Sequence, residues 1–350
     1  MSAPTSPRPS APASPELEAG LERHRRELTG YCYRMLGSLP DAEDAVQETF
    51  TRAWRSIDRF EGRAALRTWL YKIASNVCFD ALQAGQRRAI PVDLGPATTA
   101  EGMLAKGPTG EEDWVGPAPD SLVIDLAADP ASVTQARESV RLAYVAALQH
   151  LPARQRAVLI LRDVLNWRAQ EVAELLHLST AAVNSALQRA RATLAARDLE
   201  PLELTTATAD DTTTELLARF LDAFERYDMD ALALLMRDDV TQSMPPYPLW
   251  LRGRAELIAW MSGAGAGCAN SRFVLMTVNG VRGFAQYRDG GATPWSISVP
   301  VFDADGLLQD ITFFLETDGS LFRACGLPPR LEGVPDDAPT PGAVAPHRPA

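Results

Sequence analysis

The amino-acid sequence predicts a multidomain protein in which two all-α domains are followed by an α+β domain. Apolar residues recur at helical spacing over residues 21–90 and again over residues 131–197. After about residue 270 the pattern changes to period-two runs, "RFVLMTVNG", "GFAQYRD", "PWSISVPVFD" and "LLQDITFFLE", separated by NG, DGG and DADG turns. Helices that precede such an antiparallel meander are typical of an α+β domain, and 350 residues suffice for two or three domains.

The composition excludes several classes of protein. No window approaches eighteen consecutive apolar residues, so we expect no membrane span. The proline-rich residues 1–20 lack the apolar core of a secretory signal and are expected to be a disordered tail. The cysteines form no CxxC pair and have no histidine nearby, which argues against a zinc site or a disulfide framework. We therefore expect a cytoplasmic protein with no metal and no cofactor.

Charge and helix-breaking residues divide the chain further. The formal net charge is −11, yet residues 21–90 and 151–197 are each net basic. Residues 91–130 are acidic and rich in proline and glycine, which predicts a flexible linker. A second linker is expected at 198–212, and a disordered tail at 328–350. Basic blocks in an acidic chain favour local contact with a polyanion such as nucleic acid.

Residues 177–197, "HLSTAAVNSALQRARATLAAR", contain three arginines and no acidic residue. His177-Leu178-Ser179 predicts the tight turn of a helix-turn-helix, with Ser179 or Thr180 as N-cap of its second helix. The buried stripe of that helix is expected to be Val183, Leu187, Ala190 and Leu194. The opposite face suits the major groove, because Asn, Gln and Arg pair with base edges. The residues predicted to contact DNA are Thr180, Ala181, Asn184, Ser185, Gln188, Arg189 and Arg191.

A second basic block, "EGRAALRTWLYKIASNVCFDALQAGQRR", places an aromatic, a cation, an amide and an acid on one helix face. Aromatic side chains beside arginines suit single-stranded nucleic acid, whose unstacked bases need a π-surface. The residues assigned to this surface are Arg63, Arg67, Trp69, Lys72, Asn76, Asp80, Arg87 and Arg88. The alternative is that Trp69 and its apolar neighbours form core and that Asp80 is simply solvated.

Three segments in this order resemble bacterial RNA polymerase sigma factors of the extracytoplasmic-function type. They are "DAEDAVQETFTRAWR", "FEGRAALRTWLYKIASNVCFDALQ" and "LPARQRAVLILRDVLNWRAQEVAELLHLSTAAVNSALQRARATL". The resemblance implies that residues 21–90 bind core RNA polymerase and recognise and melt the minus-ten element, and that residues 131–197 recognise the minus-thirty-five element. The implied partners are the coiled coil of the largest catalytic subunit, the flap, and promoter DNA. The family has no active site of its own.

The resemblance also assigns roles to single residues. Asn76 and Asp80 lie where the family reads a flipped minus-ten base. Asn184 and Gln188 stand where an arginine and an aromatic residue can occur in relatives, so the promoter sequence does not transfer. The residues implied to dock on the largest-subunit coiled coil are Asp41, Asp44, Gln47, Glu48, Phe50 and Trp54.

Residues 213–327 resemble the SnoaL-like or NTF2-like cone fold, whose wider members include cyclases and isomerases. All four histidines lie outside this segment, so we expect regulation and not catalysis. Two interpretations stay open: the acidic domain masks the basic surfaces, or its pocket binds a small ligand. The residues expected to line such a pocket are Met244, Trp250, Trp260, Phe273 and Trp295.

"DWVGPAPD", which contains Trp114, loosely resembles a tryptophan–proline motif in the linker of related sigma factors, and Asp289-Gly290-Gly291 is similar to a glycine-rich motif of their extension. We expect Trp114 to take part in a regulatory contact between linker and extension. An alternative function is a helix-turn-helix regulator with a ligand-sensing domain, which would bind duplex DNA tightly without polymerase. A third is an enzyme with a DNA-binding appendage, which would show turnover.

Overall fold

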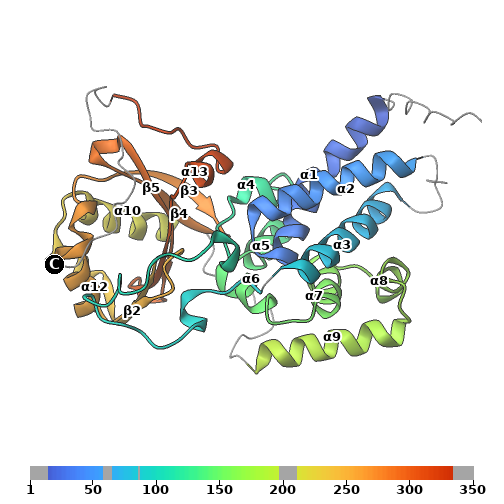
Figure 1. The fold of residues 1–350 in the computed structure, drawn as a ribbon, viewed down its shortest axis with the longest axis horizontal. Helices are drawn as coiled ribbons and strands as arrows, with labels where there is room; N and C mark the ends of the chain where they lie inside the picture. Colours follow the sequence, from blue (N-terminus) through green and yellow to red (C-terminus); the bar gives the residue numbers. More distant parts are fainter. Residues whose placement is uncertain (1–14, 58–64, 86, 197–210, 334–350) are drawn as a thin grey trace, which may run out of the picture.

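The two helical domains lie on one side of the molecule and the α+β domain on the other (Figure 1). This computed structural model describes residues 15–57, 65–85, 87–196 and 211–333. The segment after the first helical domain crosses to the α+β domain and returns before the second helical domain begins. Parts of the chain that are far apart in sequence therefore meet at the centre.

The N-terminal helical domain consists of α1 (Pro15–Leu36), α2 (Leu39–Ser56) and α3 (Leu66–Ala84). Ser38 caps α2, because its hydroxyl accepts a hydrogen bond from the backbone N–H of Asp41 (3.3 Å). Helix α1 already begins at Pro15, so the expected disorder is wrong for residues 15–20. Proline is tolerated in the first turn of a helix, where its missing N–H has no intrahelical partner to lose.

The second helical domain contains the predicted helix-turn-helix. Its elements are α5 (Pro130–Glu138), α6 (Leu142–Leu148), α7 (Ala153–Leu159), the π-helical turn η4 (Ile160–Val164), α8 (Ala169–Leu176) and α9 (Thr180–Ala195). His177 ends α8 in the left-handed conformation with φ 54°. Ser179 then caps α9 by accepting a hydrogen bond from Ala182 N (3.1 Å). The two helical domains share one hydrophobic core.

The connecting segment, residues 89–129, is packed and not a flexible linker, so that expectation is wrong. It holds the short turns η2 (Pro91–Asp93), η3 (Glu111–Asp113) and α4 (Asp120–Val123). Met103 is fully buried in the core of the α+β domain, and Trp114 is 3% exposed. Thr98 N donates to Trp250 O (2.8 Å). The helix breakers prevent long helices here, but the apolar residues between them find partners on the neighbouring domains.

The C-terminal domain is the predicted α+β domain. A six-stranded sheet has the order β2-β1-β6-β5-β4-β3, in which β1 pairs with β6 in parallel and all other pairs are antiparallel. The strands are β1 (Met236–Ser243), β2 (Trp250–Arg252), β3 (Arg272–Val278), β4 (Val281–Arg288), β5 (Thr293–Phe302) and β6 (Leu308–Leu315). The meander from β3 to β6 is confirmed, whereas β1 and β2 lack a clear period-two pattern and were not expected.

Helices cover one face of this sheet (Figure 1). They are α10 (Asp211–Glu225), α11 (Met229–Leu234) and α12 (Arg254–Ser262), followed by the turn η5 (Ala264–Cys268). The DGG turn η6 (Asp289–Gly291) joins β4 to β5. On the other face, Phe322 of α13 (Ser320–Ala324) packs in a smaller core that also contacts Leu142 of the second helical domain.

Candidate polymerase and nucleic-acid interfaces

Helix α9 separates a buried stripe from an exposed polar face. The buried residues are Val183, Ala186, Leu187, Ala190 and Leu194. All seven predicted DNA contacts are exposed: Thr180, Ala181, Asn184, Ser185, Gln188, Arg189 and Arg191. Arg191 differs from the others, because its guanidinium donates to both carboxylate oxygens of Asp163 (2.7 and 2.8 Å). This pairing across 28 residues has no local sequence signal.

Helix α3 presents Asn76 and Asp80 on its exposed side, one turn apart, while Lys72 is half-buried. Asp80 accepts a hydrogen bond from Arg52 Nη1 (3.1 Å), and Arg52 Nε also donates to Glu48 (2.7 Å). One arginine of α2 therefore joins a predicted DNA contact to a predicted polymerase contact. Trp69 is half-buried against the helical core, as the alternative interpretation expected.

Arg67 of α3 lies at the boundary between the two helical domains. Its Nε donates to Glu27 Oε2 (2.8 Å), and its guanidinium stands 5.2 Å from the ring centroids of both Tyr71 and Trp167. Tyr71 and Trp167 are themselves in ring contact at 5.1 Å. A predicted minus-ten contact is thus stacked on an aromatic residue of the second helical domain.

The arginines at the end of the second basic block are also engaged. Arg87 Nη1 donates to His150 Nδ1 (2.8 Å) in the second helical domain. Arg88 Nη2 donates to Asp41 Oδ2 of α2 (2.5 Å), which pairs another predicted DNA contact with a predicted polymerase contact. Arg63 lies outside the described residues.

Helix α2 borders a groove of about 410 Å³ against α1. Asp44, Gln47 and Trp54 are exposed, Asp41 and Glu48 are half-buried, and Phe50 is buried. The large apolar ring of Trp54 is 37% exposed. The groove is lined by Glu18, Leu21, Glu22, Arg25, Gln47, Phe50, Thr51, Trp54 and Arg55. The residues from α1 were missed, since nothing in the α1 sequence marks which face meets α2.

Two buried arginines cross the boundary between the helical domains in opposite directions. Arg34 of α1 donates to Ser139 Oγ (2.7 Å) and Ala136 O (3.3 Å), and Arg156 of α7 donates to Met35 O and to Gln149 O (3.0 Å). Each is 3% exposed. Burial lowers the pKa of both guanidinium groups to about 10, because their described partners are carbonyls and hydroxyls and not carboxylates.

The connecting segment meets the C-terminal domain at the β3–β4 turn. Asn279 Oδ1 accepts from Ala118 N (3.0 Å), and Asn279 N donates to Ala118 O (2.9 Å). Asp120 Oδ1 accepts from Gly280 N (2.8 Å). The expected contact between linker and extension is therefore present, but on the side of the extension it involves the NG turn and not the DGG turn.

Of the two motifs expected to form that contact, "DWVGPAPD" takes part through Ala118 and Asp120, whereas the DGG turn and Trp114 have other partners. The hydrogen bonds of the DGG turn run within the C-terminal domain, where Gly290 N donates to Asn270 O (2.8 Å) and Leu331 N to Gly291 O (3.0 Å). The disordered tail expected at 328–350 is therefore wrong for residues 328–333, and residues 334–350 lie outside the described residues. The carbonyl of Trp114 accepts from Arg88 Nη1 (3.0 Å). Its buried indole N–H has no hydrogen-bond partner among the described residues. A regulatory role of Trp114 stays a prediction.

The expected pocket residues do not form one lining. Met244, Trp260 and Phe273 pack in the core beneath α10 and α12, where Phe273 contacts Phe224 and Phe284 at ring distances of 5.2 Å. Trp250 Nε1 instead donates to Gly95 O of the connecting segment (2.9 Å). The guanidinium carbon of Arg288 lies 4.4 Å from the centroid of the Trp295 ring.

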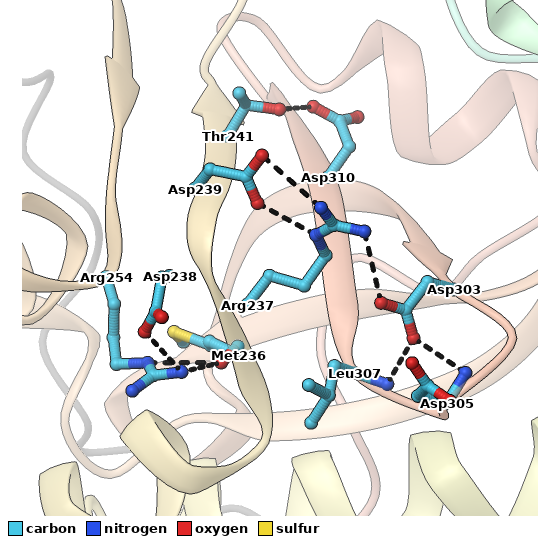
Figure 2. A network of polar contacts seen from close by, with 10 residues as sticks. All are labelled: Met236, Arg237, Asp238, Asp239, Thr241, Arg254, Asp303, Asp305, Leu307 and Asp310. Atoms are coloured by element: carbon cyan, nitrogen blue, oxygen red, sulfur yellow. Dashed lines mark hydrogen bonds and ion pairs between the residues drawn. The ribbon is translucent and has the colours of Figure 1, made fainter.

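Acidic residues of β1, of β6 and of the turn between β5 and β6 form ion pairs and hydrogen bonds (Figure 2). Arg237 binds Asp239 (2.8 Å) and Asp303 (3.3 Å). Thr241 Oγ1 donates to Asp310, whose pKa is raised by burial to about 6.

Within the described ranges there is no group of three or more His, Cys, Asp or Glu residues that could hold a metal ion. Nor does that part of the chain contain a helix long and apolar enough to span a membrane.

Comparisons with known proteins agree with this architecture. Three family models match: Sigma-70 region 2 over residues 21–88, Sigma-70 region 4 over residues 141–194, and a SnoaL-like domain over residues 217–306. A crystal structure of the extracytoplasmic function sigma factor SigJ of Mycobacterium tuberculosis matches the fold with a TM-score of 0.58 at 23% identity, over 89% of this chain and 100% of that one.

Curated relatives are similar in sequence as well. The ECF RNA polymerase sigma factor SigJ of Mycobacterium tuberculosis (strain H37Rv) is 30% identical over 221 residues, which is 63% of this chain and 62% of that protein. The ECF RNA polymerase sigma factor SigG of the same strain is 42% identical over 322 residues, 90% of this chain and 85% of that protein. The chain therefore belongs to the extracytoplasmic-function family of RNA polymerase sigma factors.

Proposed function

We propose that this sigma factor binds core RNA polymerase through α2 and directs promoter-specific transcription initiation through α3 and α9. The exposed ring of Trp54, next to the groove between α1 and α2, is the type of side chain that contributes most when an interface buries it. Asp44 and Gln47 surround it with polar groups. The coiled coil of the largest catalytic subunit is the partner we assign to this surface, and the flap is the partner of the second helical domain.

Recognition of the minus-thirty-five element is assigned to α9. The observation that carries the proposal is the exposure of Asn184, Gln188 and Arg189 on a helix face that contains no carboxylate, behind a regular helix-turn-helix. Phosphates would repel acidic side chains there. Amide and guanidinium groups can pair with adenine and guanine edges in the major groove.

Recognition of the minus-ten element is assigned to α3. Asn76 and Asp80 are exposed one turn apart and can read the polar edge of an extruded base, with Lys72 beside them to neutralise phosphate. Arg67, Arg87 and Arg88 hold other partners in this structure and would have to exchange them for DNA.

The two DNA-reading helices are too close together to read a promoter as they stand. Elements centred about 25 base pairs apart lie roughly 85 Å apart along B-DNA at ~3.4 Å per base pair. Here α3 packs directly against α8, which is adjacent to α9, so the two reading helices are only about two helix diameters apart, roughly 20–30 Å. Promoter binding therefore requires the two helical domains to separate.

The C-terminal domain is assigned a modulating role and no catalysis. It contacts the connecting segment and both helical domains, which favours modulation through intramolecular contacts over a ligand pocket. Direct masking of the α9 surface is not supported, because its predicted DNA contacts are exposed. Its acidic side chains on β1 are held in ion pairs with arginines (Figure 2).

Run-off transcription with core RNA polymerase tests the proposal. Full-length protein, a chain ending at Ala196, and an N184A/Q188A double variant would be compared on a panel of promoters. We expect promoter-dependent transcripts that the double variant reduces. Polymerase-independent binding to duplex DNA without any transcript would instead favour the helix-turn-helix regulator.

A further inference from the structure

The β3–β4 turn is buried, which is unusual for the tip of a hairpin. Val278 pairs with Val281, so Asn279 and Gly280 form a two-residue turn, with φ 51° and 75°. Hairpin tips normally face solvent, because a buried loop carries backbone polar groups that need partners. Asn279 is nevertheless 1% exposed. Its surroundings supply those partners from three other parts of the chain.

The side chain of Asn279 is fully hydrogen-bonded by these parts. Its amide nitrogen donates to the hydroxyl of Tyr33 on α1 (2.6 Å) and to Val140 O, just before α6 (2.8 Å). Its amide oxygen accepts from Ala118 N of the connecting segment (3.0 Å). One residue of the C-terminal domain therefore binds both helical domains and the segment between them.

Gly280 adds a hydrogen bond to a buried carboxylate and packs tightly against the backbone of Arg137. Its N–H donates to Asp120 Oδ1 (2.8 Å), a fully buried carboxylate whose other oxygen lies 3.5 Å from Arg137 Nε of α5. A Cβ at Gly280 would lie 2.3 Å from Arg137 O, and the positive φ already disfavours other residues. The fit leaves no room for a side chain.

Part of the boundary between the helical domains consists of buried charged groups and not of the shared hydrophobic core. Arg34 and Arg156 are buried there without carboxylate partners among the described residues. A buried charge that is hydrogen-bonded but unpaired is costly, and the cost is recovered when the group returns to water. Separation of the domains therefore loses less free energy than separation of a wholly apolar interface of the same size would, although it exposes part of the shared core, and the bonds of Asn279 add to what holds the domains closed.

We propose that the Asn279-Gly280 turn is a latch that holds the two helical domains closed against each other, and that the turn must leave its site before the factor can bind a promoter. The latch is the contact through which the C-terminal domain would modulate the factor. Only its effect on promoter binding rests on the proposed function. Latch release separates α3 from α8 and frees Arg67 and Arg87 from their partners Trp167 and His150.

The latch is tested by a distance measurement on the full-length chain without polymerase or DNA. Spin labels are attached at Q83C on α3 and A192C on α9, both exposed, in a background where Cys268 and Cys325 are changed to serine. Asn279→Ala removes three side-chain hydrogen bonds and is expected to raise the ratio of open to closed molecules about tenfold or more. Asn270→Ala is the matched control, since Asn270 is also left-handed but bonds within its own domain.

Two further variants act on the same contact, and of these Asp120→Ala leaves the hairpin itself unaltered and so separates latch release from misfolding of the hairpin. Gly280→Ala keeps the hydrogen-bonding groups of Asn279 but places a methyl group against Arg137 O. Asp120→Ala weakens the same contact from the connecting segment and leaves the C-terminal domain unchanged. Both are expected to lengthen the label distance. Unchanged distances in all three variants would overturn the latch.

The same variants are then assayed for promoter binding with core polymerase. We expect the open variants to bind promoter DNA more tightly than wild type by about the factor that their open population rises. Opening without such a rise would overturn the regulatory role. If no form supports transcription from any promoter, the proposed function fails, while the distances still decide whether the latch exists.

Discussion

The hydroxyl of Tyr33 accepts a hydrogen bond of 2.6 Å from Asn279, a residue 246 positions later in the chain. The same hydroxyl donates to Gly116 O at 2.8 Å. It therefore joins α1 to the C-terminal domain and to the connecting segment at one buried point. Because Tyr33 and Asn279 are both buried, water cannot readily replace the hydroxyl as a partner of the Asn279 amide.

Tyr33→Phe is expected to destabilise the full-length protein by about 1–3 kcal/mol, since the ring still packs but the buried amide of Asn279 and the half-buried carbonyl of Gly116 each lose a hydrogen bond. Denaturant unfolding followed by tryptophan fluorescence measures this. Tyr31→Phe is the matched control, because Tyr31 bonds Ser75 within the N-terminal helical domain (2.8 Å). A chain ending at Ala196 lacks Asn279 but keeps Gly116, so it should show a smaller dependence on Tyr33 and an unchanged dependence on Tyr31. Equal effects in both chains would contradict the bridging role.

How well the sequence predicts a feature depends on how far apart in the chain the interacting residues lie. The α9 stripe and the Ser179 cap follow from local spacing, and the structure has them as expected. The NG turn was also predicted, but its burial depends on Tyr33 and Val140, which no local pattern connects to it. The same holds for Met103, whose helix-breaking surroundings predicted a flexible linker although its side chain is buried in another domain.

Asn184→Ala and Gln188→Ala are each expected to weaken minus-thirty-five recognition by about 1–3 kcal/mol, roughly 5- to 150-fold, if each pairs bidentately with a base. Fluorescence anisotropy of the holoenzyme on labelled promoter DNA measures this. Gln170→Ala on α8 is the control, as an exposed amide outside the predicted contacts. A uniform loss on promoter and random DNA alike would contradict base reading and indicate phosphate contact.

Asp163→Asn is expected to release Arg191 from its bidentate ion pair and make it available to a phosphate. Non-specific DNA affinity should rise, and the slope of log K against log salt should steepen by about 0.9, the value for one additional phosphate contact. A salt titration of duplex binding measures the slope. The double variant D163N/R191A is expected to lose the gain. If it keeps the gain, removal of the negative charge alone is the cause.

Trp54→Ala is expected to lower affinity for core polymerase by about tenfold or more, because the variant lacks the exposed aromatic ring that the proposed interface would bury. Competition for core polymerase against a labelled sigma factor measures it. Val92→Ala is the control, since Val92 is another exposed apolar residue, 41% exposed, on the connecting segment. Similar losses in both variants would argue against a specific docking surface on α2.

Asp310 makes the stability of the C-terminal domain depend on pH. Its pKa is raised by burial from 3.8 to about 6, and the hydrogen bond from Thr241 lowers it only in part. Folding thus favours the neutral carboxyl. The stability from this group is fully present below pH 4 and is lost as pH rises through about 6.

Asp310→Asn keeps an oxygen that can accept from Thr241 but cannot ionise. It is therefore expected to be more stable than wild type by about 2–3 kcal/mol at pH 8, a shift of roughly two pKa units, and to match wild type at pH 4 or below. Denaturant unfolding of both chains from pH 4 to pH 8 gives this difference. Asp239→Asn, an exposed carboxylate on β1 whose pKa is lowered by Arg237, should show no such gain at high pH. A similar gain there would assign the effect to net charge, and burial of Asp310 would not be the cause.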